Sequence, residues 1–399
     1  MKKIQRISEI ERKYVEEVLN NEFSASKTYT MVTRMEQEFA SKFGKKYGIA
    51  MVNGTVTLHM ALEAAGVKAG DEVICPPLTM SSTSIAILMA NAVPVFADVD
   101  EDTFLITAKE IKKKITSKTK AIITVSTYGL SPEMKEIMEL AKENRLTVIE
   151  DNAECYGAYQ NGKIVGTYGD MASYSFQSSK HITSGEGGIV ITDDDELADK
   201  MRRYSGLGYA GVNNKKGRIT KDDIQSPDYE RHVILGWNYR MSDLCAAVVL
   251  GQLERMEEFV EMRQLCAKYY DDVVRSSEIL QAQRVLPGNT NSYWTYAVKL
   301  DTDKVDWFAF RKKFLELGGD GYYAAWKLAY QEPLFRQKNF LNREKLGIYD
   351  DYDFEKVSCP KAEKLQRQII QLKTNYYDEE QVKEQADVLK KTIDFFEKH

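Results

Sequence analysis

The feature that most restricts the fold of this chain is a regular alternation of short apolar runs and helical patterns between residues 47 and 192. The apolar runs cover 47–52, 71–75, 93–98, 121–125 and 146–151, and the helical patterns between them cover 56–65, 82–92, 108–115 and 132–145. Strands that alternate with helices of about 10–14 residues form right-handed βαβ units and build a mainly parallel sheet with helices on both faces. The later runs 172–176 and 189–192 have no helix between them, so we expect them to pair as antiparallel strands.

The pattern changes after Ser242, a suitable N-cap for a long helix that runs to about residue 276. Strands over 293–300 and 322–326 and helices over 307–317 and 379–398 follow. We therefore predict an α/β protein with a three-layer αβα large domain over 12–255 and a smaller α+β C-terminal domain over 256–399. Residues 1–11 are expected to pack with the smaller domain. The polar stretch 205–234 is too long for a plain connection and is predicted to be functional.

Charge and composition exclude several classes of function. The chain holds 55 Lys and Arg against 60 Asp and Glu, a net charge of −5, which does not indicate a nucleic-acid-binding surface. No apolar leader opens the sequence, and no apolar run approaches the roughly 18 residues that span a bilayer. The five cysteines form no C-x-x-C pair, and the four histidines offer no i, i+4 pair. We therefore expect reduced thiols, no metal site, no membrane segment and a cytoplasmic protein.

Lys180 is the first candidate catalytic residue. It lies in a Ser- and Gly-rich segment, Tyr174–Gly188, and no acidic residue lies within five positions of it. A lysine among hydroxyl groups, without a carboxylate nearby in sequence, is suited to nucleophilic use. Taken alone, the pattern fits a surface lysine in a serine-rich turn equally well.

Two further motifs favour the catalytic interpretation. The apolar run Leu146–Asp151 ends in a carboxylate, and ligands of open parallel sheets bind beyond the carboxyl ends of the strands. Pyridoxal phosphate needs a lysine for its Schiff base and an acid beside its pyridinium nitrogen, which suits Lys180 and Asp151. The segment Asn53-Gly54-Thr55 lies between a strand and a helix start, where backbone N–H groups and the helix dipole favour an anion such as phosphate.

In order and spacing, these motifs resemble those of the DegT-type sugar aminotransferases, a branch of the fold type I, aspartate-aminotransferase-like pyridoxal-phosphate enzymes. The resemblance extends from about residue 10 to the end of the chain. It rests on Asn53-Gly-Thr55, Asp71-Glu-Val-Ile, Val93-Pro-Val-Phe-Ala-Asp-Val-Asp, Glu150-Asp151-Asn-Ala-Glu154, Ser175-Phe176, Lys180, Gly185-Glu-Gly-Gly188 and Asn238-Tyr-Arg240.

The resemblance implies a role for each matching residue. Lys180 would be the Schiff-base lysine and proton shuttle, and Asp151 would be the partner of the pyridinium nitrogen. The phosphate cup would consist of Gly54, Thr55 and Ser175, and Glu154 would lie near the phenolic oxygen of the cofactor. Asn238, with Arg240, would reach the phosphate from the neighbouring subunit, so the active unit would be a homodimer with shared active sites.

Two segments depart from the family pattern. An aromatic residue usually stacks on the pyridine ring, but here the segment Pro76-Pro77-Leu78-Thr79-Met80 places a methionine at that position. Met80 either covers the ring through its sulfur or fills a gap in the core. The second departure is the C-terminal third, where Tyr322, Tyr323 and Trp326 either line the substrate pocket or pack in the core. His181 is either a substrate contact or structural, because adjacent residues of an extended chain point to opposite faces.

The expected activity is transamination from an amino acid, glutamate or glutamine, to a keto sugar, nucleotide-linked or free, or to a similar polyhydroxy ketone or aldehyde. One alternative is a sugar dehydratase of the same family, but those enzymes carry histidine in place of the lysine. Another is a non-catalytic regulator, which the retained lysine, aspartate and phosphate-turn glycine disfavour. A nucleotide-binding oxidoreductase is disfavoured because no G-x-G-x-x-G follows the first strand.

Overall fold

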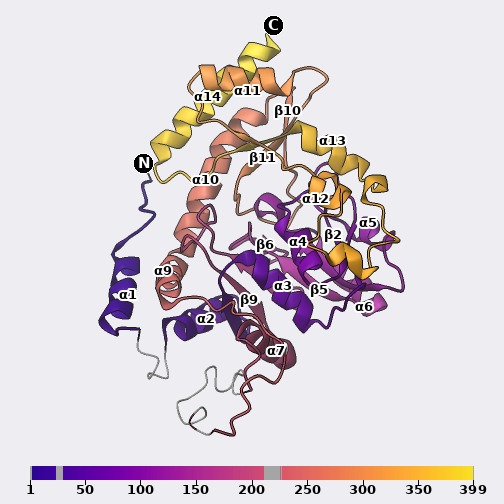
Figure 1. The fold of residues 1–399 in the computed structure, drawn as a ribbon. Helices are drawn as coiled ribbons and strands as arrows, with labels where there is room; N and C mark the ends of the chain where they lie inside the picture. Colours follow the sequence, from indigo (N-terminus) through magenta and orange to yellow (C-terminus); the bar gives the residue numbers. More distant parts are fainter. Residues whose placement is uncertain (1, 24–29, 211–224, 226, 399) are drawn as a thin grey trace.

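A seven-stranded sheet forms the centre of the protein in the computed structural model, which describes residues 2–23, 30–210, 225 and 227–398 (Figure 1). Residues 211–224 and 226 of the predicted loop 205–234 lie outside the described residues. The strand order is β1-β9-β8-β5-β4-β2-β3. The strands are β1 (Tyr47–Met51), β2 (Glu72–Cys75), β3 (Val93–Phe96), β4 (Thr119–Val125), β5 (Thr147–Asp151), β8 (Met171–Ser175) and β9 (Gly188–Thr192).

The sheet is mainly parallel, as the alternation of strands and helices predicts. Strands β3, β2, β4, β5 and β8 run parallel to one another, because a helix or a long connection carries the chain back between them. Strand β9 runs antiparallel to both β8 and β1. The expected antiparallel pair of residues 172–176 and 189–192 is therefore confirmed. A short hairpin of β6 (Tyr159–Gln160) and β7 (Lys163–Ile164) lies outside this sheet.

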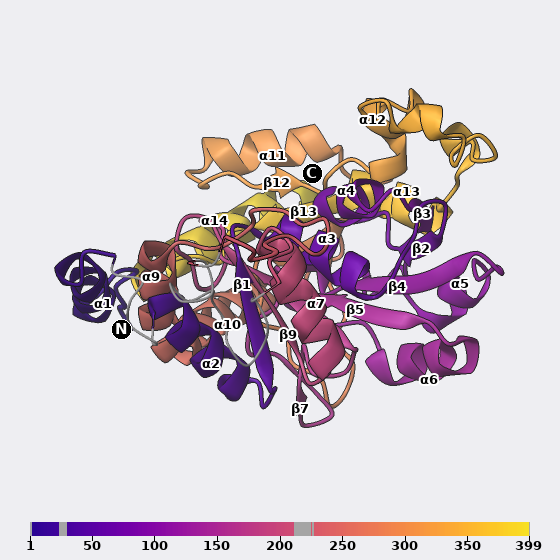
Figure 2. The ribbon, with the colours of Figure 1, turned by 60° about the horizontal axis from the view of Figure 1, so that its bottom comes forward.

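Helices cover both faces of the sheet, which confirms the three-layer prediction (Figures 1 and 2). On β1, Ile49 and Met51 pack in a core with Leu58 of α3, whereas Ala50 packs on the opposite face with Phe39 of α2. This alternation follows from the two-residue period of a strand. The helices of these layers are α2 (Met31–Lys42), α3 (Gly54–Ala64), α4 (Ser82–Met89), α5 (Ala108–Lys112), α6 (Met134–Asn144), α7 (Asp195–Ser205) and α9 (Asp243–Glu254).

A smaller antiparallel sheet with its own helices follows in the chain, in the order β10-β11-β13-β12. Figure 1 shows it at one end of the molecule, joined to the large sheet through α10. The long helix predicted from Ser242 to about residue 276 is divided at Arg255, whose backbone leaves the helical region. The elements are β10 (Leu280–Ala282), β11 (Tyr296–Leu300), β12 (Tyr323–Ala324), β13 (Ile369–Leu372), α10 (Met256–Val274), α11 (Trp307–Glu316) and α14 (Glu379–Glu397).

Two segments pack against parts of the fold that are distant from them in the sequence. The N-terminal segment before α1 (Glu9–Asn20) pairs at Lys3 with Asp378. The segment 328–362, with α12 (Pro333–Arg336) and the start of α13 (Pro360–Gln368), packs against the edge of the large sheet, where Phe335 contacts Phe96. This segment therefore shares the core of the large sheet, and the domain limits 12–255 and 256–399 stay a prediction. In the described part of the chain, no helix has the length and apolar character needed to cross a bilayer.

Candidate active site

Asp151 lies at the carboxyl end of β5 and is almost fully buried. Its carboxylate accepts hydrogen bonds from the Thr83 hydroxyl (2.8 Å) and from the backbone N–H of Ala153 (3.2 Å). Burial raises the pKa of the Asp151 carboxyl, and the hydrogen bond from Thr83 acts in the opposite direction. Thr83, on α4, was not singled out from the sequence, because nothing near it in the chain indicates a contact with residue 151.

Lys180 lies next to a second buried acid, Glu154. Its ammonium nitrogen is 3.7 Å from Glu154 Oε1, and its side chain is only 11% exposed. The other Glu154 oxygen accepts the backbone N–H of Tyr128 at 3.0 Å. Burial raises the pKa of Glu154, and the charge of Lys180 opposes this shift. Lys180 has no acid near it in the sequence, but in the folded protein it lies next to one. The fold brings the lysine beside the residues that follow β5.

The indole ring of Trp294 lies beside the Lys180 side chain. The Lys180 ammonium lies 4.5 Å from the centre of the Trp294 ring, and the ring face attracts a cation. The indole N–H donates a hydrogen bond to the carbonyl of Ser179 (3.0 Å). Trp294 in turn stacks on Trp326, with the ring centres 5.7 Å apart. Trp294 lies in the strand predicted over 293–300, but β11 begins only at Tyr296. Its contact with Lys180 has no local signal in the sequence, since the two residues are far apart in the chain.

The predicted phosphate cup assembles at the start of α3. A Cβ atom at Gly54 would lie 2.8 Å from the Cβ of Ser175, so only glycine allows this approach of α3 to the end of β8. The Asn53 side chain accepts the backbone N–H groups of Thr55 (3.1 Å) and Val56 (3.0 Å). Asn53 therefore caps the helix and fixes the direction in which Gly54 and Thr55 enter it.

Met80 lies in the turn before α4 and is 49% exposed. Its sulfur accepts hydrogen bonds from the backbone N–H of Ser82 (3.3 Å) and from the Ser82 hydroxyl (3.1 Å). A side chain with this exposure does not fill a gap in the core, so the core alternative for Met80 is wrong. Met80 is three residues before Thr83, the hydrogen-bond donor to Asp151.

Three of the predicted substrate-side residues, His181, Tyr322 and Tyr323, have different surroundings. His181 is buried and its Nε2 lies 2.9 Å from the carbonyl of Ser292; burial holds its pKa well below the ordinary value, so the ring is neutral. Tyr322 is buried in the core of the small sheet against Trp307, whereas Tyr323, on β12, is 77% exposed. A substrate contact of these three side chains stays a prediction.

The segment that contains Asn238 and Arg240 runs beside the end of β1. The backbone of Arg240 forms an isolated antiparallel β-bridge with Met51, and the backbone N–H of Val52 donates to the carbonyl of Tyr239 at 2.9 Å. Asn238 and Arg240 are both exposed. The fold thus brings this segment next to the turn that precedes α3, with its polar side chains accessible.

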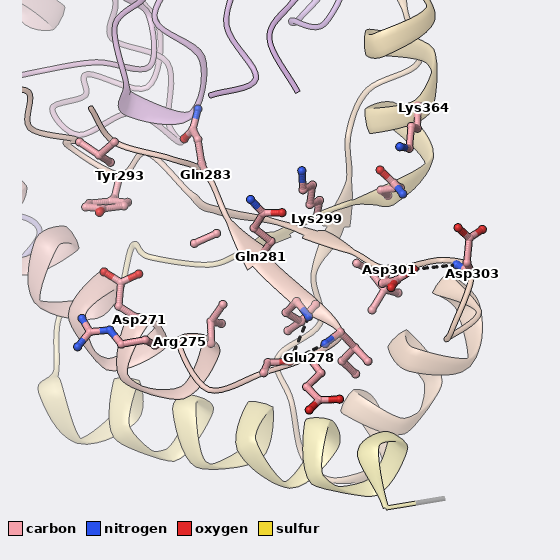
Figure 3. A pocket seen from close by; sticks show the side chains of 18 residues that line it. Asp271, Arg275, Glu278, Gln281, Gln283, Tyr293, Lys299, Asp301, Asp303 and Lys364 are labelled. Carbon is pink, nitrogen blue, oxygen red and sulfur yellow. Dashed lines mark hydrogen bonds between the residues drawn. The ribbon is translucent and has the colours of Figure 1, made fainter. Parts of the chain in front are cut away.

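A hollow of about 840 Å³ lies elsewhere, between the end of α10, strands β10 and β11, and α13 (Figure 3). Its lining includes Asp271, Arg275, Lys299 and Asp301, so charges of both signs surround it. None of the predicted site residues lines this hollow. We therefore place the candidate active site at the carboxyl edge of the large sheet, where Lys180, Asp151 and Glu154 converge.

Comparisons with known proteins agree with this geometry. Residues 5–389 match the model of the DegT/DnrJ/EryC1/StrS aminotransferase family. A GDP-perosamine synthase of Escherichia coli O157:H7 is 38% identical over 288 residues, 72% of this chain and 74% of that protein. A GDP-perosamine synthase of Vibrio cholerae is 34% identical over 293 residues, 73% of this chain and 75% of that protein.

The solved structures give the same result over the full length. The aminotransferase of Psychrobacter cryohalolentis superposes with a TM-score of 0.86 at 29% identity, and the match covers 98% of both chains. The family match spans both the large sheet and the C-terminal elements, and it includes the segments that carry Lys180, Asp151 and Glu154. The chain therefore belongs to the DegT/DnrJ/EryC1/StrS aminotransferase family and is an aminotransferase.

Proposed function

We propose that this aminotransferase uses pyridoxal phosphate and transfers an amino group from glutamate or glutamine to a keto sugar. The observation that carries the proposal is the convergence of Lys180 with two buried acids, one of which lies 3.7 Å from its ammonium nitrogen. A buried lysine beside perturbed carboxyls at the carboxyl edge of a parallel sheet is the arrangement expected of a catalytic centre.

The residues present fit the cofactor. At Gly54, a Cβ atom would lie 2.8 Å from the Ser175 Cβ and 3.1 Å from its hydroxyl oxygen, so the glycine lets the start of α3 lie directly beside the Ser175 hydroxyl. The N–H groups at a helix start together with a hydroxyl are a donor set that suits a phosphate. Asp151 is fixed by two donated hydrogen bonds at the end of β5, where an acid suits a protonated ring nitrogen. We assign Gly54, Thr55 and Ser175 to the phosphate, Asp151 to the ring nitrogen, Glu154 to the phenolic oxygen and Met80 to one ring face.

The chemistry is divided between cofactor and protein. Pyridoxal phosphate, when bound, supplies an electron sink for the electron pair left after the donor loses its α-proton. Lys180 would hold the cofactor, and its Nζ atom would be the group that moves this proton. Asp151 keeps the proton on the ring nitrogen, and Glu154 and Trp294 hold the Lys180 ammonium between an acid and a ring face. The low exposure of these groups limits competing proton exchange with water.

We propose a nucleotide-linked keto sugar as the acceptor. Two relatives that share 34–38% identity with this chain are named GDP-perosamine synthases, and the match covers about three quarters of each. A sugar dehydratase is the second candidate, but the lysine at position 180 argues against it, because dehydratases of this family carry histidine there. A non-catalytic regulator would not require the buried Asp151, Glu154 and Lys180 to be held together.

We also propose that the active unit is a homodimer in which Asn238 completes the site of the neighbouring subunit. The exposed apolar run Val233-Ile234-Leu235 precedes Asn238, and its side chains are 50%, 44% and 78% exposed. A run of this kind beside an exposed asparagine favours a protein–protein contact. The five cysteines are all free, which supports a reducing, cytoplasmic compartment.

An absorbance titration tests the proposed activity. The purified protein supplied with pyridoxal phosphate should develop a visible absorption band, and L-glutamate or L-glutamine should bleach it as the amino group moves to the cofactor. A GDP-linked keto sugar should then restore the band, and mass spectrometry should show an amino sugar. A free keto sugar serves as the comparison for the nucleotide. A band that neither amino acid bleaches would contradict an aminotransferase specific for these donors.

A further inference from the structure

Arg263, on α10, is an arginine with only 4% of its surface exposed. Its Nη1 donates to the carbonyl of Trp294 (2.5 Å) and to the Thr374 hydroxyl (3.2 Å). Its Nη2 donates to the carbonyls of Ser179 (3.1 Å) and Lys180 (3.3 Å). These four hydrogen-bond acceptors, all within the described residues, are three backbone carbonyls and one hydroxyl, and none is a carboxylate.

The contacts of Arg263 belong to a wider set that holds the lysine loop, residues 177–181. The carbonyl of Ser178 accepts from Arg6, and that of Ser179 accepts from the Trp294 indole as well as from Arg263. Three successive carbonyls of this loop therefore receive donors from other parts of the chain. Among the residues that the structure describes, Arg263 alone binds both the loop and the carbonyl of Trp294, whose ring lies beside the Lys180 ammonium.

A buried guanidinium without a carboxylate carries a desolvation cost that a purely apolar contact would not have. Burial lowers the pKa of Arg263 to about 10, so the group remains charged at neutral pH. Hydrogen bonds from a charged donor are shorter and stronger than neutral ones, and the planar fork of arginine reaches several acceptors at once. The carbonyl dipoles of the loop thus compensate the buried charge, and the charge in turn fixes the loop.

We propose that Arg263 is a positioning residue that fixes the backbone of Lys180 relative to the indole ring of Trp294. This inference rests on the proposed catalytic role of Lys180. The lysine side chain has four flexible methylene groups, so the location of its nitrogen depends on a fixed backbone below it. A displacement of about 1 Å in such a site lowers turnover by as much as roughly 100-fold.

Three variants test the proposal in the full chain. Arg263→Lys retains the positive charge but offers donors from a single point, which cannot reach carbonyls on both segments. Thr374→Val is milder, since it removes only the hydroxyl that accepts from Arg263 and donates to the carbonyls of Tyr293 (2.7 Å) and Trp294 (2.9 Å). The control is Arg202→Lys, a largely buried arginine that binds Glu36 and the carbonyl of Gly48.

The first measurement is hydrogen exchange in the cofactor-free protein, which does not depend on activity. In the wild type, the backbone N–H groups of Ser179, Lys180 and Ser184 are hydrogen-bonded within or next to the loop. We expect Arg263→Lys to speed exchange in peptides that cover 177–184 and 292–295, and Thr374→Val to do so to a smaller extent. Arg202→Lys should leave both peptides at the wild-type rate.

The second measurement separates kcat from the KM of the amino donor. We expect Arg263→Lys to lower kcat about 10- to 100-fold with KM little changed, because the lysine is misplaced and the donor pocket is intact. Wild-type kcat in Arg263→Lys, or a lowered kcat with unchanged exchange at 177–184, would overturn the proposal. If Arg263→Lys does not fold, Thr374→Val decides by the same two criteria. A wild-type protein without transaminase activity would refute the proposed function, whereas the exchange data would still show whether Arg263 holds the loop.

Discussion

Three neighbours of different chemistry surround Lys180. Glu154 supplies a carboxylate 3.7 Å away, the Trp294 ring lies on another side, and the Arg263 guanidinium holds the backbone from below. An acid and an aromatic face both attract an ammonium group, so they orient the lysine when it is free. The same neighbours restrict it to a small volume next to Asp151, which is what repeated proton transfer at one atom requires.

Replacing Lys180 with alanine should abolish transamination with little effect on the fold. The rate should fall by at least about 10⁴-fold, the upper range for a positioned acid–base group, because the anchor of the cofactor is lost as well. Thermal unfolding and steady-state rates provide the measurement, with Lys135→Ala, an exposed lysine on α6, as the control. Measurable turnover in Lys180→Ala at rates near the control would refute the assignment.

Replacing Asp151 with asparagine should lower activity but stabilise the cofactor-free protein at neutral pH. Burial raises the pKa of the Asp151 carboxyl in the folded state, so the folded protein binds this proton more tightly than the unfolded chain. The free energy of unfolding then falls as pH rises from the unfolded pKa through the folded pKa. Asparagine fits the same contacts, because Thr83 can accept from its amide and Ala153 can still donate to its oxygen.

The measurement is a series of melting temperatures across pH without cofactor. Asp151→Asn should melt above the wild type at pH 7, and the difference should vanish at acid pH, where the aspartate is protonated in both states. Activity should fall roughly 10²–10⁴-fold, since a neutral partner no longer holds the ring proton. Equal melting at all pH values would show that the Asp151 charge is compensated in the cofactor-free site.

Replacing Met80 with phenylalanine should be tolerated and should strengthen cofactor binding. Met80 is 49% exposed, so a larger ring does not overpack the core. If the side chain covers the pyridine ring, a flat ring gains about 0.5–1.5 kcal/mol of stacking, whereas Met80→Ala loses the contact. Cofactor dissociation constants and melting temperatures of both variants measure this. A phenylalanine variant with unchanged affinity would mean that another group covers the ring.

The sequence predicts the acids and the lysine of the site but not the side chains around them. Lys180 and Asp151 can be predicted because each lies in a local pattern, a Ser/Gly turn and a strand end. Thr83, Trp294 and Arg263 have no such pattern, since their contacts with the site join residues far apart in the chain. The environment of Lys180 could not be predicted for the same reason, because Glu154 approaches it only in the folded chain.

The start of α3 links stability to the proposed phosphate site. Asn53 accepts two N–H groups of the first turn, and Asn53→Ala should destabilise the protein by about 0.5–2 kcal/mol. Asn53→Asp keeps the cap but places a negative charge beside the proposed phosphate. We therefore expect Asn53→Asp to melt like the wild type and to bind pyridoxal phosphate more weakly, as measured by thermal unfolding and cofactor titration. Wild-type affinity in Asn53→Asp would place the phosphate elsewhere.

The elements themselves follow closely from local patterns, and the differences have long-range causes. The strands of the large sheet and the helices between them, from 47 to 192, agree with the prediction within a few residues, because apolar periodicity and the βαβ rule act locally. The short hairpin of β6 and β7 in the same range was not predicted. The break at Arg255 was not predicted. There the guanidinium pairs with Glu11 and Glu258, and its partner Glu11 comes from the distant helix α1. Likewise, the return of segment 328–362 to the large sheet depends on Asp98, which accepts the N–H groups of Lys361 and Ala362.

The segment before α9 combines an exposed apolar run with an exposed asparagine, and a single chain explains neither. Val233, Ile234 and Leu235 expose apolar side chains next to one another, and burying such surface stabilises an association. Asn238 follows on the same segment, which lies along the end of β1 near the start of α3. In the proposed symmetric dimer, this segment would pack on the partner subunit, and each exposed asparagine would face the neighbouring site.

Mixed dimers test this arrangement. Lys180→Ala and Asn238→Ala should each be inactive alone, but in a hybrid dimer with shared sites, one site holds both intact residues. Random mixing makes about half of the dimers hybrid with one working site of two, so roughly a quarter of the wild-type activity should return. Co-expression with two affinity tags isolates the hybrid, which should then reach about half of the wild-type rate. If Asn238 instead serves its own subunit, no site in the hybrid is complete and the purified hybrid stays inactive. Wild-type activity in the Asn238→Ala protein alone would show that this residue is not required at all.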